Sequence, residues 1–200
     1  MERVNRVYLV RHGQVVGYER FPAYGHTDVD LTEVGIIQAE HVAERLRFTN
    51  IDAIYASDLK RSVMGARIIA RHHDVPLLVL PELREVYFGD WEGLSFPEIR
   101  ERFPGAVERR KADLLNFRPP GEGESVRQLS ERIMPCFQDI LSRHNGNDIL
   151  VVAHGAVNRV ILCSALNLDL AHMFNFHQDY GCLNIIDYFP DRTVVKLING

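Results

Sequence analysis

Short apolar runs alternate with amphipathic stretches along most of this chain. Tyrosine and β-branched residues, which favour extended backbone, are frequent in the apolar runs. Between the runs, apolar residues recur at the three- and four-residue spacing of helices that cover a core. This alternation predicts a mainly parallel sheet with helices on both faces. The predicted strands span residues 7–10, 51–56, 76–80 and 149–153.

Helical spacing predicts four longer helices and two short ones. Side chains that can accept hydrogen bonds from a first turn stand at the start of three of them: Thr32 in the first, Ser57 with Asp58 in the second, and Ser125 in the third. Pro135 lies inside one helix and should kink it. The longer helices are expected over residues 32–48, 57–73, 125–144 and 156–166, and the short ones over residues 95–103 and 106–117.

Three segments depart from the strand–helix alternation. Residues 15–30, with Gly17, Pro22 and Gly25, predict a long irregular loop, and such loops are often functional. Residues 94–124 hold the two short helices, and we expect a helical insertion that could act as a lid. Residues 182–198 predict a hairpin that adds antiparallel strands to one edge of the sheet. We see no linker, so we expect a single domain over residues 1–200.

Composition narrows the class of protein. The chain is 46% hydrophobic and 25% charged, which is ordinary for a globular protein. Its net charge of −4 argues against a nucleic-acid partner, which requires a basic stripe. The N-terminal apolar run is too short for a signal peptide, and no stretch approaches the roughly 20 apolar residues of a membrane span. We therefore expect a cytoplasmic protein without a membrane partner.

The cysteines suggest neither a disulfide framework nor a metal site. Cys136, Cys163 and Cys182 are far apart in the sequence and have apolar neighbours. No two of them have the close spacing that metal ligands or redox pairs show. They predict reduced thiols in the core, as in most proteins of the cytosol.

Two predicted strands end in the same dipeptide. The first runs into Arg11, His12 and Gly13, and the last runs into His154 and Gly155. Glycine lets the backbone turn sharply or approach a ligand closely. Ligands bind at the carboxyl ends of parallel strands, so the two imidazoles would meet at one edge if the strands are neighbours. One such ending is usually an ordinary turn, but two of them indicate a site.

A further arginine points to an anionic ligand. Arg61 lies in the first turn of a predicted helix, where a cation opposes the helix dipole. A nearby anion would justify this position, and a solvated surface arginine is the alternative. Together, Arg11 and Arg61 would give bidentate recognition of a tetrahedral oxyanion. A neutral imidazole such as that of His12 is a competent nucleophile toward phosphorus.

A proton donor is expected in the acidic and aromatic segment that follows residue 81. Glu82, Glu85 and Glu92 are all candidates, because hydrophobic neighbours raise the pKa of a carboxyl group as a general acid requires. Arg84 either lines a pocket or pairs with a carboxylate. We expect Trp91 to be a packing anchor for this segment.

Four segments together resemble the signature segments of the histidine phosphatase superfamily, the phosphoglycerate mutase-like group. They are YLVRHGQ, SDLKRS, LREVYFGDWEG and VVAHGA, and they occur in the family's order. The resemblance covers nearly the whole chain. It implies a three-layer α/β/α sandwich and a phosphatase that needs no metal or other cofactor. It also implies that His12 is the phosphorylated nucleophile and that Glu85 is the proton donor.

The same resemblance assigns the phosphate pocket. Arg11 and Arg61 would clamp the phosphoryl group, and His154 would donate to one of its oxygens. Tyr18 stands where the family often has a phosphate-binding asparagine, and Gln14 would partly replace that contact. Gly155 is a further phosphate-binding candidate, and the candidate substrate contacts are Tyr18, His26 and Arg84.

The segments FGDWEG and QDYGCLNIIDY are similar to those of α-ribazole-5′-phosphate phosphatases of cobalamin biosynthesis. This similarity implies a small phosphate ester such as α-ribazole 5′-phosphate as the substrate. Phosphoglycerate mutases, phosphoserine phosphatases and broad-specificity phosphatases share most of the segments, so they stay open as alternatives. The non-enzymatic alternative is a protein that binds a phosphorylated ligand without turnover. A homodimer is compatible with the sequence.

Overall fold

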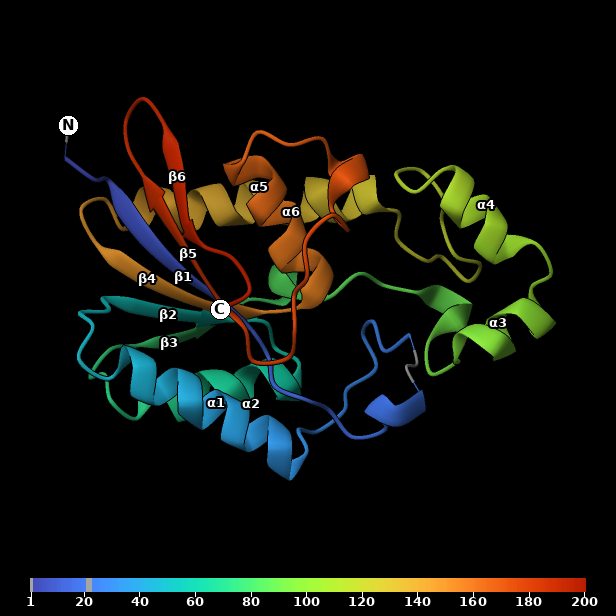
Figure 1. The fold of residues 1–200 in the computed structure, drawn as a ribbon, viewed down its shortest axis with the longest axis horizontal. Helices are drawn as coiled ribbons and strands as arrows, with labels where there is room; N and C mark the ends of the chain where they lie inside the picture. The colour runs from blue at the N-terminus through green and yellow to red at the C-terminus, as the bar shows by residue number, and fades with distance from the viewer. Residues whose placement is uncertain (1, 21–22) are drawn as a thin grey trace.

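A mixed sheet of six strands runs through the middle of the protein (Figure 1). The structure is a computed structural model, and it describes residues 2–20 and 23–200; Pro22 of the predicted loop lies outside these residues. The strand order is β3-β2-β4-β1-β5-β6, and the first four strands are parallel. The strands are β1 (Asn5–Arg11), β2 (Ala53–Ala56), β3 (Leu77–Val79), β4 (Asp148–Ala153), β5 (Leu183–Tyr188) and β6 (Thr193–Leu197).

The two strands that end in His-Gly are neighbours at the centre of this sheet. β1 pairs with β4 so that Arg11 lies opposite Ala153. The backbone N–H of His12 then donates to the carbonyl of Ala153 at 3.0 Å. The predicted meeting of both histidines at one edge is therefore confirmed. The antiparallel edge, formed by β5 and β6, is also confirmed.

Helices cover both faces of the sheet, which makes the predicted three layers (Figure 1). One hydrophobic core lies under α1 and α2, and the other lies under α5 and α6. Thr32 and Ser125 cap α1 and α5 as predicted, because each side chain accepts a hydrogen bond from the first turn. The helices are α1 (Glu33–Leu46), α2 (Lys60–Ala70), α3 (Phe96–Arg102), α4 (Ala106–Ala112), α5 (Val126–Arg143) and α6 (Gly155–Ala165).

The predicted start of α2 is wrong. Ser57 and Asp58 do not cap this helix, which starts after Leu59 without a cap from that residue's side chain. Instead, the carboxylate of Asp28, in the loop over residues 15–30, accepts from the N–H of Lys60 at 2.8 Å. A capping partner so distant in the sequence cannot be found from local propensity.

The insertion over residues 94–124, which we call the cap, lies beyond one end of the sheet (Figure 1). It has a small core of its own, in which Trp91 packs with Ile99, Ala106 and Val107. Trp91 is only 1% exposed, so its predicted role as a packing anchor is confirmed. The second predicted helix of the cap is shorter than expected and ends at Ala112 instead of residue 117.

None of the described helices is both long enough and apolar enough to cross a membrane. All three cysteines are free thiols, of which Cys163 and Cys182 are buried and Cys136 is partly buried.

Candidate active site

The two histidine rings face each other edge to face at the carboxyl ends of β1 and β4. Their centroids are 5.1 Å apart, and both rings are buried. Nδ1 of His12 lies 2.8 Å from the carbonyl oxygen of Gly13. A carbonyl only accepts, so in the neutral ring Nδ1 carries the proton and Nε2 keeps a free lone pair. His12 is thus held in the tautomer that a nucleophile requires.

Burial and nearby cations keep both rings neutral. Loss of solvation is the largest cause that lowers the pKa of His12 well below its usual value, and the positive charges of Arg61 and Arg11 add to it. The pKa of His154 is lowered in the same way, first by burial and then by Arg61. Neutral imidazole is the nucleophilic form, so this environment favours attack on an electrophile.

His154 presents one free hydrogen-bond donor. Its Nε2 lies 2.6 Å from the hydroxyl of Ser57, which is fully buried. The hydroxyl of Ser57 has no other acceptor among the described residues, and when it donates to Nε2, His154 carries its proton on Nδ1. This Nδ1 is buried and finds no partner in the described part of the chain. A buried donor without a partner is costly unless a ligand accepts from it.

Two guanidinium groups stand beside the histidines. Arg61 is 1% exposed, which excludes the solvated surface alternative, and it donates to the carbonyls of Thr27 and Gly25 at 2.8 and 2.7 Å. Arg11 lies over the ring of Tyr180 at 4.0 Å and donates to the carbonyl of Gln178 at 2.5 Å. The Nε of Arg11 is buried, and no described residue accepts from it. Both cations are fixed in place by backbone and ring contacts.

Of the three candidate acids, the structure brings only Glu85 to the site. Its carboxylate oxygens accept from the N–H groups of Val86 and Ala156 at 2.8 and 3.1 Å. Glu92 is occupied elsewhere, because its carboxylate accepts from the N–H of His26 at 2.6 Å and from the hydroxyl of Thr27 at 2.8 Å. The side chain of Glu82 is at the exposed surface. Glu85 therefore suits the role of a proton donor best.

A cavity of about 250 Å³ opens next to Arg11 and Glu85. Its floor includes Gly155 at the start of α6, and its far wall comes from the cap. A Cβ built on Gly155 would lie 3.2 Å from Nη1 of Arg159 and 3.5 Å from Nε of Arg11. A side chain at this position would slightly crowd the guanidinium of Arg159, whereas Arg11 would stay at ordinary contact distance. The cavity can hold the leaving group of an ester whose phosphoryl group lies at the histidines.

The other predicted site residues do not line this cavity. The side-chain oxygen of Gln14 accepts from the hydroxyl of Thr32 at 2.9 Å, which ties it to the start of α1. His26 binds the backbone carbonyl of Glu85 at 2.8 Å, so it supports the segment that carries the acid. Tyr18 lies in a short 3₁₀ helix (Tyr18–Arg20). Their roles in substrate binding stay predictions.

The sequence left open whether Arg84 lines a pocket or pairs with a carboxylate, and the structure shows a pair with a carboxylate. Its Nε and Nη2 bind both carboxylate oxygens of Asp58 at 2.7 and 2.5 Å. This bidentate pair joins the start of α2 to the segment that carries Glu85. Arg84 is also absent from the described lining of the cavity, and a contact with substrate stays a prediction.

Four residues of the site went unnoticed in the sequence: Ser57 as a partner of His154, and Arg110, Arg159 and Tyr180. Arg159 follows Gly155 by four residues, and this helical spacing on α6 could have revealed it. Ser57 had been assigned to a helix cap, and Arg110 and Tyr180 gave no local signal. Among residues 2–20 and 23–200, no three His, Cys, Asp or Glu side chains are placed to hold one metal ion.

A sequence model of the histidine phosphatase superfamily, branch 1, matches residues 7–200. The chain belongs to this superfamily. An adenosylcobalamin/alpha-ribazole phosphatase from Salmonella typhimurium is 29% identical over 195 residues, which cover 98% of this chain and 96% of that protein. A metal-independent phosphoserine phosphatase from Arabidopsis thaliana is 36% identical over 160 residues, which cover 79% of this chain and 67% of that protein.

Solved structures agree with the family assignment. An alpha-ribazole phosphatase from Shigella flexneri superposes with a TM-score of 0.90 at 26% identity, covering 98% of this chain and 96% of that one. The predicted α/β/α fold of the phosphoglycerate mutase-like group is thus confirmed, as is the predicted membership. As a member of this phosphatase superfamily with phosphatase relatives over nearly its whole length, the protein is a phosphoric monoester hydrolase.

Proposed function

We propose that this phosphatase works through a phosphohistidine intermediate on His12. The observation that carries the proposal is the tautomer of His12, whose Nδ1 is bound to the carbonyl of Gly13 at 2.8 Å. Its Nε2 lone pair is then available in a neutral ring that lies near two fixed guanidinium groups. Arg11, Arg61 and the Nδ1–H of His154 supply donors for the three equatorial oxygens of a transferring phosphoryl group.

The reaction has two balanced steps. In the first, Nε2 of His12 attacks phosphorus while the ester P–O bond breaks, and Glu85 gives its proton to the leaving oxygen. In the second, Glu85 takes a proton from water, whose oxygen attacks phosphorus while the P–N bond breaks. Inorganic phosphate leaves and His12 is regenerated. A covalent intermediate of this kind divides one difficult hydrolysis into two easier steps.

Gly155 and Gln14 are proposed to assist phosphate binding in different ways. Gly155, at the start of α6, lies beside the guanidinium of Arg11, whose Nε is 3.5 Å from the position a Cβ would take. Gln14 follows the RHG segment directly, and its amide nitrogen is the group that would reach an oxygen of the phosphate. Its oxygen is already bound to Thr32.

Two observations favour different leaving groups. The walls of the cavity include Phe88, Trp91 and Phe96, which suit the flat aromatic base of α-ribazole 5′-phosphate. The same cavity holds Arg110 and Arg159, which suit an acidic leaving group such as that of phosphoserine. The relatives from Salmonella typhimurium and Arabidopsis thaliana carry names that match the two classes.

The test of the chemistry is hydrolysis of 4-nitrophenyl phosphate with a chelator present. His12→Ala should lower kcat by roughly 10³-fold or more, because the loss of a nucleophile removes the covalent route. His41→Ala, which changes an exposed histidine on α1, is the matched control and should keep wild-type activity. Equal turnover by His12→Ala and wild type would contradict the proposal.

A further inference from the structure

The cavity beside the phosphate pocket contains more positive charge than a phosphoryl group requires. Arg11, Arg110 and Arg159 line it, whereas Glu85 is the one carboxylate among its described lining residues. A phosphoryl dianion held by Arg11 and Arg61 balances those two cations. Arg110 and Arg159 then face a single carboxylate, that of Glu85. At least one cation in the cavity is left without a counter-charge.

Arg110, on α4 of the cap, is that unbalanced cation. Among the described residues it forms no ion pair within 4.0 Å and no hydrogen bond, and burial alone lowers its pKa. Glu124 lines a neighbouring cavity together with Arg110, but both of its carboxylate oxygens bind Arg132, at 2.9 and 2.7 Å. A partly buried guanidinium without a partner is unfavourable, so a position of this kind indicates a ligand that supplies the charge.

Arg159 is fixed closer to the phosphate end of the cavity. Its Nη1 donates to the carbonyl of Gly155 at 3.1 Å, and its guanidinium lies 5.3 Å from the centroid of the Phe174 ring. It stands beside Arg11 over Gly155, where burial and the charge of Arg11 lower its pKa and the charge of Glu85 opposes that lowering. The two cations are therefore unequal: Arg159 has Glu85 near it, and Arg110 faces the cavity from the cap.

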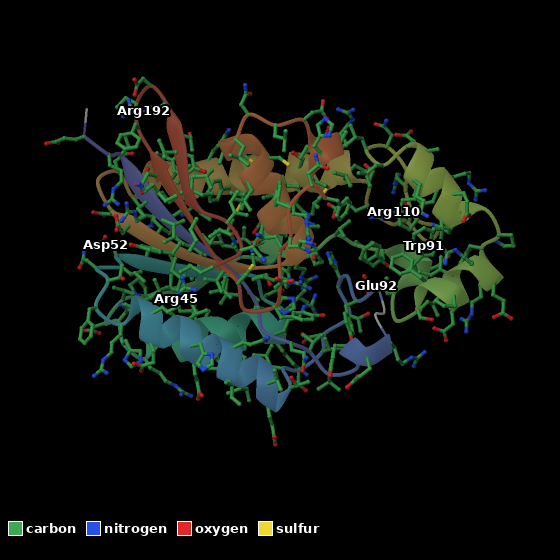
Figure 2. All side chains as sticks on the ribbon, viewed as in Figure 1. Arg45, Asp52, Trp91, Glu92, Arg110 and Arg192 are labelled. Atoms are coloured by element: carbon green, nitrogen blue, oxygen red, sulfur yellow. The ribbon has the colours of Figure 1, made fainter. Side chains whose placement is uncertain are left out.

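The remaining surface between these cations is apolar. Phe88, Trp91, Phe96 and Phe174 line the cavity, and they come from the acid-bearing segment, the cap and the segment after α6. Figure 2 shows Arg110 and Trp91 on the side of the cap that faces the body of the molecule. Aromatic walls favour a flat or apolar group, and a guanidinium that lines the cavity from the cap favours a two-oxygen acid bound in bidentate fashion.

We infer that the leaving group of the natural substrate joins an apolar body to an acidic group, and that Arg110 binds this acid. The inference rests on the proposed function, since it concerns the leaving group of the same ester, and it makes Arg110 a specificity-determining residue. A substrate with an uncharged leaving group, such as α-ribazole 5′-phosphate, would leave Arg110 unpaired and bind less tightly.

The test compares two phosphonates that cannot be hydrolysed, 4-carboxybenzylphosphonate and its uncharged isostere 4-carbamoylbenzylphosphonate. Trp91 is the only tryptophan and lines the cavity, so its fluorescence reports binding directly. We expect the acid to bind wild-type protein at least about tenfold more tightly than the amide, as a bidentate charged pair at a partly buried guanidinium provides. Arg110→Gln should reduce this ratio to near one, and Arg110→Lys should retain part of it.

Arg109→Gln is the matched control, because it removes an exposed arginine from the same helix and should leave the ratio unchanged. Equal affinities for the two compounds in wild type, or the same ratio in Arg110→Gln, would overturn the inference. The titration needs no turnover, so its failure is distinct from a failure of the phosphohistidine mechanism. A third compound, 1,4-bis(phosphonomethyl)benzene, tells whether a carboxylate or a second phosphoryl-type acid fits Arg110 better.

Discussion

At the scale of single residues, the site depends on which nitrogen of each histidine carries the proton. The carbonyl of Gly13 fixes this for His12, and the hydroxyl of Ser57 fixes it for His154. The two rings are thereby given opposite tasks: His12 offers a lone pair at Nε2, and His154 offers a donor at Nδ1. Neither task follows from the residue types alone, because a neutral imidazole has both nitrogens available.

The substitution Ser57→Ala tests whether Ser57 keeps His154 in the form that donates from Nδ1. Without the hydroxyl, Nε2 of His154 loses its buried partner, at a cost of about 1–3 kcal/mol, and the ring no longer has a preferred tautomer. We expect kcat to fall by about tenfold and vanadate to bind more weakly, since fewer molecules present a proton on Nδ1. Ser57→Thr should restore most of the activity. Steady-state kinetics and vanadate inhibition measure both effects, and unchanged vanadate affinity in Ser57→Ala would contradict the assigned role.

The sequence predicted some of these residues for sound physical reasons. Arg11, His12 and His154 follow apolar runs, and a strand delivers the next residues to its carboxyl end whatever the rest of the fold does. Glu85 was different, since three carboxylates in one segment were equally acceptable. The family resemblance alone selected Glu85, and the structure adds that Glu92 is used to hold the loop around His26. Arg110 could not be recognised, since its position depends on how the cap folds back.

At the scale of elements, close backbone packing holds the catalytic turn. A Cβ added to Gly13 would lie 2.1 Å from the carbonyl oxygen of Gly35 in α1, and a Cβ on Gly35 would lie 2.1 Å from that of Gln14. Gly13 therefore serves a helix contact, whereas the sequence had suggested a sharp turn or a close approach to ligand. The end of β1 and the first turn of α1 lock together around His12.

Gly13→Ala should disturb this contact. Neither backbone can move without displacing β1 or α1, and overpacking in a rigid interior costs about 1–3 kcal/mol or more. We expect lower thermal stability and a loss of most activity. Gly93→Ala offers a control for glycine replacement, because a Cβ there meets no atom within 4 Å, although its positive φ of 76° adds some strain. Denaturant unfolding compares the two, and a Gly13→Ala protein as stable as wild type would contradict the packing argument.

Element boundaries show what local patterns can and cannot predict. The central strands were predicted well because burial on both faces requires an uninterrupted apolar run. The start of α2 was not predicted well, because Asp28 caps this helix from another part of the chain. Ser57 binds His154 instead, and Asp58 binds Arg84. Side chains that usually cap helices were used at the site instead, and sequence alone does not show that change of role.

At the scale of the whole molecule, the fold keeps the two histidines of the site buried and uncharged. The pKa values of His12 and His154 are lowered in the folded protein, whereas the unfolded chain has ordinary histidines. Below a pH of about 6.5 the unfolded state therefore binds more protons, and folding stability is lost as the pH falls. Burial therefore both keeps His12 in its nucleophilic form and makes the folded protein less stable in acid.

His12→Asn should reduce this acid sensitivity. Each such histidine contributes at most about 1.4 kcal/mol per pH unit to the slope of unfolding free energy below pH 6.5, and the variant lacks one of them. Denaturant titrations between about pH 5 and pH 7.5 give the slope. His41→Asn, at an exposed position, is the control. Identical slopes for His12→Asn and wild type would show that His12 is not held neutral by burial.

The central claim is that the phosphoryl group passes through Nε2 of His12, and the most direct measurement is to trap it there. Rapid alkaline quenching during turnover of 4-nitrophenyl phosphate preserves a phosphorus–nitrogen bond, and mass spectrometry of the peptides locates the added group. The account predicts one phosphoryl group on His12 and none on His154. A label on His154, or turnover with no labelled histidine at any quench time, would contradict it.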